Sequence, residues 1–302
     1  MNAALLRWTS YQLWKAQCRL NLPLIGLVQG DQRHALEQAW ELDSSKLGTL
    51  RPGLCVVITT HKRPEACAAL LTQLHAELPV QLRSDTQVIV LEDASSSDYT
   101  SVFELGQRLF DQRFLFLRSR RWLGKQGYYL TYQAAFTLAR RIQPTHTLFI
   151  QDDLSLAPDF FARAFALWGS IRDRKKAVLS LISFGDDEVH GRWTRYKRRK
   201  LLGGKVWKTQ WFDLPAYLVD EYFFETLGYR VFPADPLRFA RGLGISSGIG
   251  EQLTRRLWRR GNIYQAAQTL VFHGEHESVM NTNARGDRPF DNRAVVKQAR
   301  SK

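Results

Sequence analysis

The sequence predicts an α/β protein whose mostly parallel sheet is flanked by helices and preceded by an N-terminal helical extension. From Leu54 onward, short β-branched runs alternate with stretches of helical periodicity, a pattern typical of a parallel sheet covered on both faces. The chain has 302 residues, 44% of them hydrophobic, which is enough to bury a full core. The adjacent carboxylates Asp152 and Asp153 directly follow an apolar run, at the strand end where such sheets gather their ligands.

The first fifty residues are expected to form the helical extension. Leucine and tryptophan side chains recur at helical spacing between Leu5 and Leu20, and a second helix is predicted over 34–42. The basic residues that flank the aromatic side chains of the first helix are Arg7, Lys15 and Arg19. This helix could therefore lie on a membrane surface or, more simply, pack against the main domain.

The remaining elements follow from the periodicity of the apolar residues. In the first half, strands are predicted over 55–59, 87–91, 114–118 and 147–151, with helices over 64–78, 99–110 and 127–142. In the second half, we expect a helix over 160–171, a strand over 178–184, a helix over 250–260 and a last strand over 263–272. The polar segment 280–302 is expected to be a mobile tail.

The charge of the chain points to an anionic partner or surface. Lys and Arg number 43 against 29 Asp and Glu, a net charge of +14. The stretch from Arg192 to Lys208 holds eight basic residues and no acidic one, with three aromatic residues between them. Such a stretch fits a surface that follows the phosphates of nucleic acid or contacts anionic lipid headgroups, or else a solvated loop.

The cysteines and the hydropathy of the sequence indicate in which cellular compartment the protein is expected. The three cysteines have no metal-ligand spacing, and their odd number argues against a disulfide framework. No signal peptide is recognised, and no apolar run approaches the roughly 20 residues that a bilayer requires. A cytoplasmic protein without a transmembrane segment is expected, although peripheral membrane contact stays open.

Polar side chains follow three of the predicted strands. Thr60 and Arg63 precede the helix-starting Pro64, where free amides can bind anions. Asp93 ends the second strand and could accept hydrogen bonds from a base or ribose, or belong to a helix cap. Asp152 and Asp153 could hold Mg²⁺ or Mn²⁺ against a phosphate, or cap a helix.

Taken in order, these motifs resemble those of the GT-A fold glycosyltransferases, especially of the family 2 type, over about residues 54–278. The matching residues are Thr60, Arg63 and Pro64, then Asp93, then Gly124, Lys125 and Gly127, then Gln151, Asp152 and Asp153, and last a helix starting near Glu251 with a strand ending at His273. The resemblance implies a metal-dependent enzyme that moves a sugar from a nucleotide-sugar donor, expected to be UDP-linked, to an acceptor hydroxyl. It also implies a nucleotide-sugar-binding half over 51–190 and an acceptor-binding half with the tail over 191–302.

The resemblance assigns roles to individual residues. The residues expected to hold the nucleotide sugar are Thr60, Arg63, Asp93, Gly124, Lys125 and Asp152. Asp153 is expected to contact Mn²⁺ or Mg²⁺, with His273 or His276 completing the metal shell.

A catalytic base is expected if the reaction inverts the sugar configuration. Glu251 is the first candidate, although the family usually has Glu-Asp at this place and only Glu251 is present here. Asp220 and Glu221 are the reserve candidates, because the segment 217–224 could face the acceptor.

The sequence leaves several candidates for the acceptor of the sugar. A 5-hydroxymethylated pyrimidine in DNA is the first hypothesis, because basic and aromatic residues are interleaved in the acceptor half. The residues expected to bind it are Arg192, Trp193, Lys197, Arg198, Arg199, Lys200 and Trp207. The alternatives are a cell-surface saccharide or lipid-linked acceptor and, in another class, a non-catalytic nucleic-acid-binding protein. A nucleotidyltransferase would require a Gly-rich basic signature that 59–64 lacks.

Overall fold

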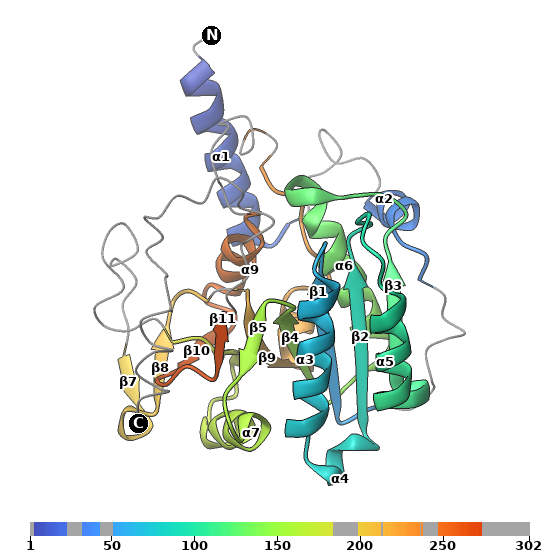
Figure 1. Ribbon diagram of the computed structural model, residues 1–302. Helices are drawn as coiled ribbons and strands as arrows, with labels where there is room; N and C mark the ends of the chain where they lie inside the picture. Colours follow the sequence, from blue (N-terminus) through green and yellow to red (C-terminus); the bar gives the residue numbers. More distant parts are fainter. Residues whose placement is uncertain are drawn as a thin grey trace.

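A computed structural model describes residues 3–22, 32–42, 51–183, 199–212, 214–235, 237 and 247–273. Within these residues, nine strands form one sheet in the order β3-β2-β1-β4-β9-β6-β10-β8-β7 (Figure 1). The strands are β1 (Leu54–Thr60), β2 (Thr86–Glu92), β3 (Phe114–Arg118), β4 (His146–Gln151), β6 (Lys176–Ser180), β7 (Arg199–Leu201), β8 (Val206–Thr209), β9 (Ala216–Asp220) and β10 (Asn262–Ala266). Only β8 and β9 run against the others, so the predicted mostly parallel sheet is confirmed.

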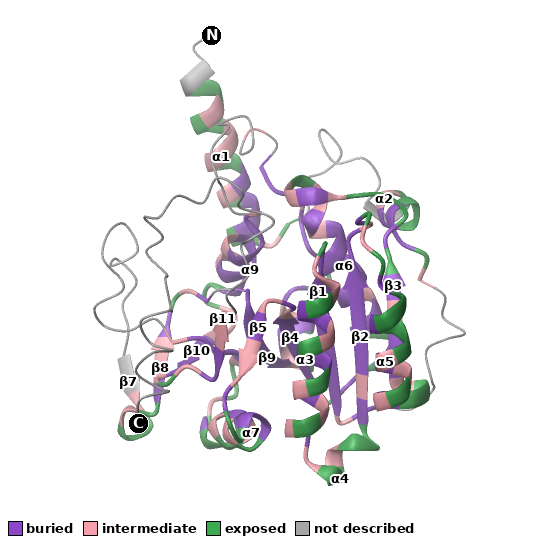
Figure 2. Cartoon of the chain, viewed as in Figure 1, coloured by how far each residue is buried: buried purple, intermediate pink, exposed green. Residues whose placement is uncertain are grey.

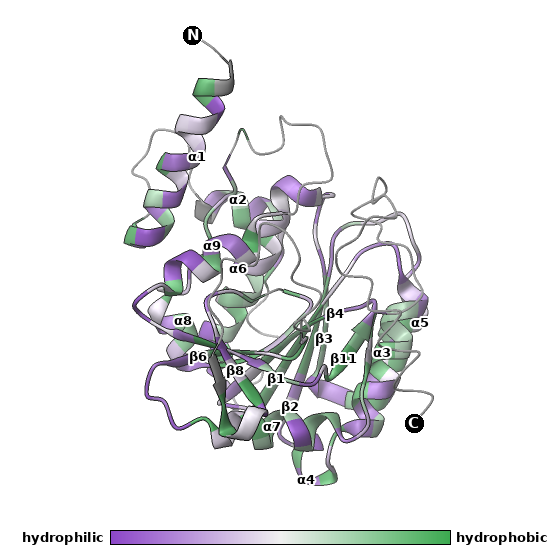
Figure 3. Cartoon of the chain, turned by 90° about the vertical axis from the view of Figure 1, so that its left-hand side faces the viewer, coloured by the Kyte–Doolittle hydropathy of each residue, from purple (hydrophilic) through white to green (hydrophobic). Residues whose placement is uncertain are grey.

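Helices cover both faces of this sheet (Figure 3). One face carries α3 (Pro64–Glu77), α5 (Thr100–Phe110) and α7 (Phe160–Ser170), whose side chains pack with the even-numbered residues of β1. The other face carries α6 (Gly124–Ile142), α8 (Glu221–Thr226) and α9 (Ile249–Leu257), which pack with the odd-numbered residues. Because β1 is covered on both sides, all seven of its residues are buried, as Figure 2 shows in purple.

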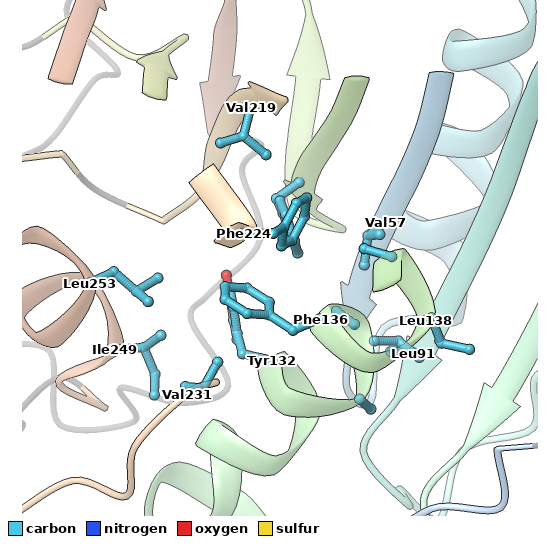
Figure 4. Close-up of a cluster of buried hydrophobic side chains, with 14 of the residues drawn as sticks. Val57, Leu91, Tyr132, Phe136, Leu138, Val219, Phe224, Val231, Ile249 and Leu253 are labelled. Carbon is cyan, nitrogen blue, oxygen red and sulfur yellow. The ribbon is translucent and has the colours of Figure 1, made fainter. Parts of the chain in front are cut away.

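Aromatic side chains pack together within the core on the α6 side of the sheet, where Figure 4 shows Tyr132, Phe136 and Phe224 among aliphatic residues. Phe136 of α6 packs against Phe149 of β4 and Phe224 of α8, with ring centroids 6.1 and 5.1 Å apart. Tyr132, one turn before Phe136, stacks on Phe149 with centroids 5.8 Å apart. These contacts fix α6 across the centre of the sheet, and α6 begins at the candidate site.

The N-terminal extension packs against the main domain, which was the simpler of the two expectations. Its helices are α1 (Ala3–Leu20) and α2 (Gln32–Ala39). Trp14 and Cys18 of α1 are buried against Phe232, and Trp14 Nε1 donates to the carbonyl of Pro233 over 3.0 Å. The α2 helix packs on α6 through Leu36. None of the helices in the described ranges has the length and apolarity needed to cross a bilayer.

The structure corrects the sequence prediction mainly in the second half. The segment predicted as one strand over 263–272 forms β10 and then β11 (Val271–His273), which belongs to a separate two-stranded sheet with β5 (Leu154–Leu156). The strands β7, β8 and β9 and the helix α8 were not predicted; the short helix α4 (Val80–Arg83) was also missed. The strand expected to reach residue 184 ends at Ser180. The predicted tail over 280–302 lies outside the described residues.

Candidate active site at the carboxyl ends of β1, β2 and β4

The candidate site forms where β1 ends between its two neighbours. The amide of Asp93, which follows β2, donates to the carbonyl of Thr60 over 3.1 Å. The amide of Asp152, which follows β4, donates to the carbonyl of Thr59 over 3.2 Å. These backbone bonds place the three predicted polar strand ends side by side.

Arg63 bridges the two adjacent carboxylates. Its Nη2 and Nε donate to Asp152 over 2.5 and 3.3 Å, and its Nη1 donates to Asp153 over 2.9 Å. The Asp152 side chain is fully buried, and that of Asp153 is 13% exposed. A buried carboxylate pair requires a compensating cation, and in this structure Arg63 supplies it.

A chain of hydroxyl groups completes the contacts of Asp152. The Thr60 hydroxyl donates to Asp152 Oδ2 over 2.7 Å, and the Tyr99 hydroxyl lies 2.7 Å from the Thr60 oxygen. Tyr99 in turn accepts the amide hydrogen of Arg63 over 3.0 Å. Both Asp152 oxygens therefore have partners, which holds this carboxylate in one orientation.

The two carboxyl groups differ in acidity. Burial raises the pKa of Asp152, although Arg63 opposes the shift. Burial acts to raise the pKa of Asp153 too, but His273 and Arg63 outweigh it and lower that pKa. The difference arises because burial dominates at Asp152, whereas the contacts with His273 and Arg63 dominate at Asp153. Asp153 is therefore the more acidic residue of the pair.

One oxygen of Asp153 is available to a cation. Asp153 Oδ1 is buried and makes no hydrogen bond in the described structure. The pairing of β11 with β5 sets His273 opposite Leu154, and His273 Nδ1 lies 3.9 Å from Asp153 Oδ2. The described residues contain no cluster of three or more His, Cys, Asp or Glu side chains. Mg²⁺ and Mn²⁺ sites on phosphate substrates need only one or two protein ligands, so Asp153 and His273 fit such an ion.

Asp93 organises the loop that leads into α6. Its carboxylate accepts the amide hydrogens of Leu123 and Gly124 over 2.6 and 2.9 Å. Gly124 has φ +55°, and a Cβ there would lie 3.2 Å from the Trp122 ring. The first glycine of the predicted Gly-x-x-Gly motif thus serves a left-handed turn that no larger side chain adopts easily. Lys125, which follows it, is partly buried, and burial lowers its pKa.

Sequence reasoning missed two aromatic contributors to this site. Tyr99 was treated only as a helix start, yet its hydroxyl joins Thr60 and Arg63. Trp122, 67% exposed, stacks on His61 with ring centroids 6.3 Å apart, and His61 Nδ1 lies 2.7 Å from the Asp93 carbonyl. The position of Trp122 within the Asp93-bound loop could have suggested it.

Glu251 lies in the first turn of α9, as predicted, and two of its partners come from α1 and α9. Its Oε1 accepts from the Tyr11 hydroxyl over 2.5 Å and from Arg255 Nη2 over 2.8 Å. The side chain is 11% exposed. The extension therefore contributes directly to the surroundings of the first candidate base.

Asp220 and Glu221 lie at the opposite end of the central strands from Asp152, beside the first residue of β4. Because β9 runs antiparallel to β4, Asp220 pairs with His146, the first residue of β4. Asp152 follows the last residue of that strand, roughly 20 Å away at the usual rise per residue. The structure does not bring the two reserve bases to the carboxylate pair, and the segment 217–224 is largely buried rather than facing an acceptor.

The basic stretch is only partly described. The strands β7 and β8 pair Lys200 with Trp207 at the edge of the sheet, five and four strands away from β4. Lys208 Nζ lies 3.9 Å from Asp173. The described part of the stretch therefore does not converge on Asp152. Arg192, Trp193, Lys197, Arg198 and His276 lie outside the described residues.

Comparisons with known proteins identify the architecture. No family model and no curated protein matches the sequence. Among solved structures, residues 1–349 of TarS from S. aureus match with a TM-score of 0.50 and 12% identity, covering 73% of this chain and 60% of that chain. The same TarS piece in complex with UDP-GlcNAc matches with a TM-score of 0.50 and 13% identity, over 76% and 60% of the two chains. GalNAc-T7 with UDP, GalNAc and Mn²⁺ matches with a TM-score of 0.53 and 14% identity, over 74% and 43%.

These likenesses confirm the GT-A fold expected from the sequence motifs. The chain spans about 60% or less of the length of these structures.

Proposed function

We propose that this chain is a metal-dependent glycosyltransferase that moves a sugar from a UDP-linked donor to an acceptor hydroxyl. One observation carries the proposal. Asp93 follows β2 and the pair Asp152 and Asp153 follows β4, on either side of the end of β1, and Asp153 Oδ1 is buried without a hydrogen bond. The complexes of TarS with UDP-GlcNAc and of GalNAc-T7 with UDP and Mn²⁺ share the fold and support the choice of donor and metal.

Asp153 and His273 would hold the metal ion. Asp153 Oδ1 offers a hard oxygen ligand, and His273 Nδ1 lies 3.9 Å from the other oxygen, Oδ2. When bound, Mn²⁺ or Mg²⁺ would neutralise the negative charge that develops on the departing diphosphate. Arg63, which now neutralises Asp153, would share that carboxylate with the ion.

The nucleotide sugar would lie against the loop that Asp93 organises. Each carboxylate oxygen of Asp93 accepts one hydrogen bond from a backbone amide. The carboxylate can accept further hydrogen bonds, here from a base or a ribose. Lys125 in the first turn of α6 would place a positive charge near the phosphates. Thr60 and Arg63 would orient Asp152 toward the sugar.

Glu251 remains the proposed base of an inverting reaction. It would take the proton of the acceptor hydroxyl as that oxygen attacks C1 of the sugar. The hydrogen bonds from Tyr11 and Arg255 would hold its carboxylate in place.

For the acceptor, a 5-hydroxymethylated pyrimidine in DNA stays the first hypothesis and a saccharide or lipid-linked acceptor the second. The basic stretch supports the first hypothesis, while its described strands lie away from the carboxylates and do not add to it. The experiment offers several nucleotide sugars to hydroxymethylated duplex DNA and, in parallel, to saccharide and lipid acceptors, and reads products by mass.

Transfer of sugar to the DNA alone supports the DNA hypothesis. Transfer to the saccharide or lipid acceptors alone rejects it in favour of the second hypothesis. A folded protein that binds DNA but consumes no donor would favour the non-catalytic alternative. The unmodified duplex is the matched control, because it presents the same phosphates without the acceptor hydroxyl.

A further inference from the structure

The α1 helix has one face that packs on the protein and another that the described structure leaves exposed. The packed face includes Trp14 and Cys18, and the Ser10 hydroxyl donates to Asp235 over 2.6 Å. Figure 2 shows buried residues only in the C-terminal half of α1, and Figure 1 shows its N-terminal half projecting from the body. The helix is therefore anchored at one end and open along its outer side.

The open side is apolar. Leu5, Leu13 and Leu20 recur with Thr9 and Ala16 between them at the spacing of one helix face. The large exposed hydrophobic residues of this segment are Leu5, Leu6, Trp8, Leu13, Leu20 and Leu22, between 44% and 60% exposed. We name this set, in which Leu22 lies two residues beyond the end of the helix, the outer face of α1. It holds six of the eleven large exposed hydrophobic residues of the described chain, so the exposure is clustered rather than scattered.

The charges beside the outer face are all positive. Residues 3–20 contain three basic residues and no acidic one, and Arg19 lies over the exposed Trp258 with its Cζ 5.2 Å from the ring centroid. A second copy of this helix would bring like charges together, which opposes self-association. Nucleic acid would match the charges but leave the leucines in water. An anionic lipid surface matches both features.

We propose that the outer face of α1 docks this protein on anionic lipid bilayers, with the helix lying in the interface. The leucines and Trp8 enter the boundary between headgroups and acyl chains, while Lys15 and Arg19, on the flank of the helix beside Trp8, meet the anionic headgroups. The buried face of α1 keeps its contacts with α9, so docking requires no unfolding. The proposal stands on α1 alone and does not depend on the chemistry of the carboxylate site.

Sedimentation of the full chain with vesicles tests the proposal. Vesicles of phosphatidylcholine are compared with vesicles that also contain phosphatidylglycerol, and the bound fraction is measured at low and high salt. Binding to the anionic vesicles is expected to exceed binding to the neutral ones and to weaken as salt rises. The double variant Leu5→Gln/Leu13→Gln is expected to lower the partition coefficient by about tenfold or more.

The matched control is Val80→Gln/Leu202→Gln, which removes two exposed apolar side chains elsewhere and should bind like the wild type. Far-UV circular dichroism and the melting temperature of both variants verify that they fold. Equal binding of the two double variants would overturn the proposal, as would equal binding to neutral and anionic vesicles. A protein that forms dimers through α1 and ignores vesicles would also overturn it.

Discussion

Arg63 donates two hydrogen bonds to the buried carboxylate of Asp152, the shorter of them 2.5 Å long. The same guanidinium reaches Asp153, so one cation bridges two acidic residues that sequence reasoning had assigned to a donor and a metal. The site is thus preorganised around Arg63, and its stability and its chemistry depend on the same contacts.

Replacing Arg63 should strongly destabilise the fold. The Arg63→Gln variant leaves two adjacent buried carboxylates without their cation, and we expect the free energy of unfolding to fall by about 2–4 kcal/mol. Urea denaturation measures the change. The exposed Arg172→Gln is the control and should change stability by less than about 0.5 kcal/mol. Equal stability of the two variants would contradict the role given to Arg63.

Two glycines should respond to alanine with opposite signs. Gly124→Ala forces a side chain into a left-handed conformation against Trp122 and should cost about 1–2 kcal/mol. Gly169→Ala in α7 meets no atom within 4 Å and should stabilise the protein by up to about 1 kcal/mol. Thermal and urea unfolding report both changes. A neutral effect at Gly124 would mean that the turn before α6 tolerates other conformations.

Asp220 should make stability depend on pH. Burial raises its pKa in the folded state, so the folded protein favours the protonated form. The stabilisation that protonated Asp220 gives the folded state is present at low pH and is lost as pH rises through the pKa of Asp220 in the folded protein. The stability of Asp220→Asn relative to wild type should therefore increase from about pH 4 to about pH 8.

Asp98→Asn is the control of opposite sign for this measurement. Hydrogen bonds from Thr100 lower the pKa of Asp98, so its contribution is present at higher pH and is lost as pH falls. The stability of Asp98→Asn relative to wild type should fall as pH rises up to about 4 and stay constant above it. If the stability difference from wild type changed with pH in the same way in both variants, burial would not control the pKa of Asp220.

His273 should contribute to metal affinity. If His273 and Asp153 share the ion, His273→Gln should weaken Mn²⁺ binding in the presence of UDP by about tenfold or more. Calorimetric titration measures the affinity. His75→Gln, which changes a histidine packed edge-on against Phe110, is the matched control. Unchanged affinity in His273→Gln would remove this histidine from the metal shell.

The first half of the fold could be predicted because its signals are local. Between Leu54 and Ile171 the strands β1 to β4 are largely buried apolar runs, and the long helices are periodic, so most of their ends lie within a residue or two of the predicted ones. The short elements α4 and β5 in the same range lack these signals and were missed. The helix before β4 was predicted to begin at Gly127 but begins at Gly124, because Asp93 caps its amides from another strand. That contact is distant in sequence and leaves no local pattern.

The second half could not be predicted in the same way. β9 is inserted antiparallel between β4 and β6, and nothing in its five residues distinguishes it from a parallel strand. This reversal is what moves Asp220 and Glu221 away from the carboxylates. Likewise, a two-stranded sheet takes His273 to Asp153, a long-range pairing that only the folded chain reveals.

The most direct test of the proposed function measures release of nucleoside diphosphate from UDP-linked sugars by the purified chain with Mn²⁺. The account predicts metal-dependent turnover by the wild type and a loss of about a hundredfold or more in Asp153→Asn, with the melting temperature showing that the variant folds. Turnover that is unchanged in Asp153→Asn, or absent in a folded wild type with every donor, would contradict it.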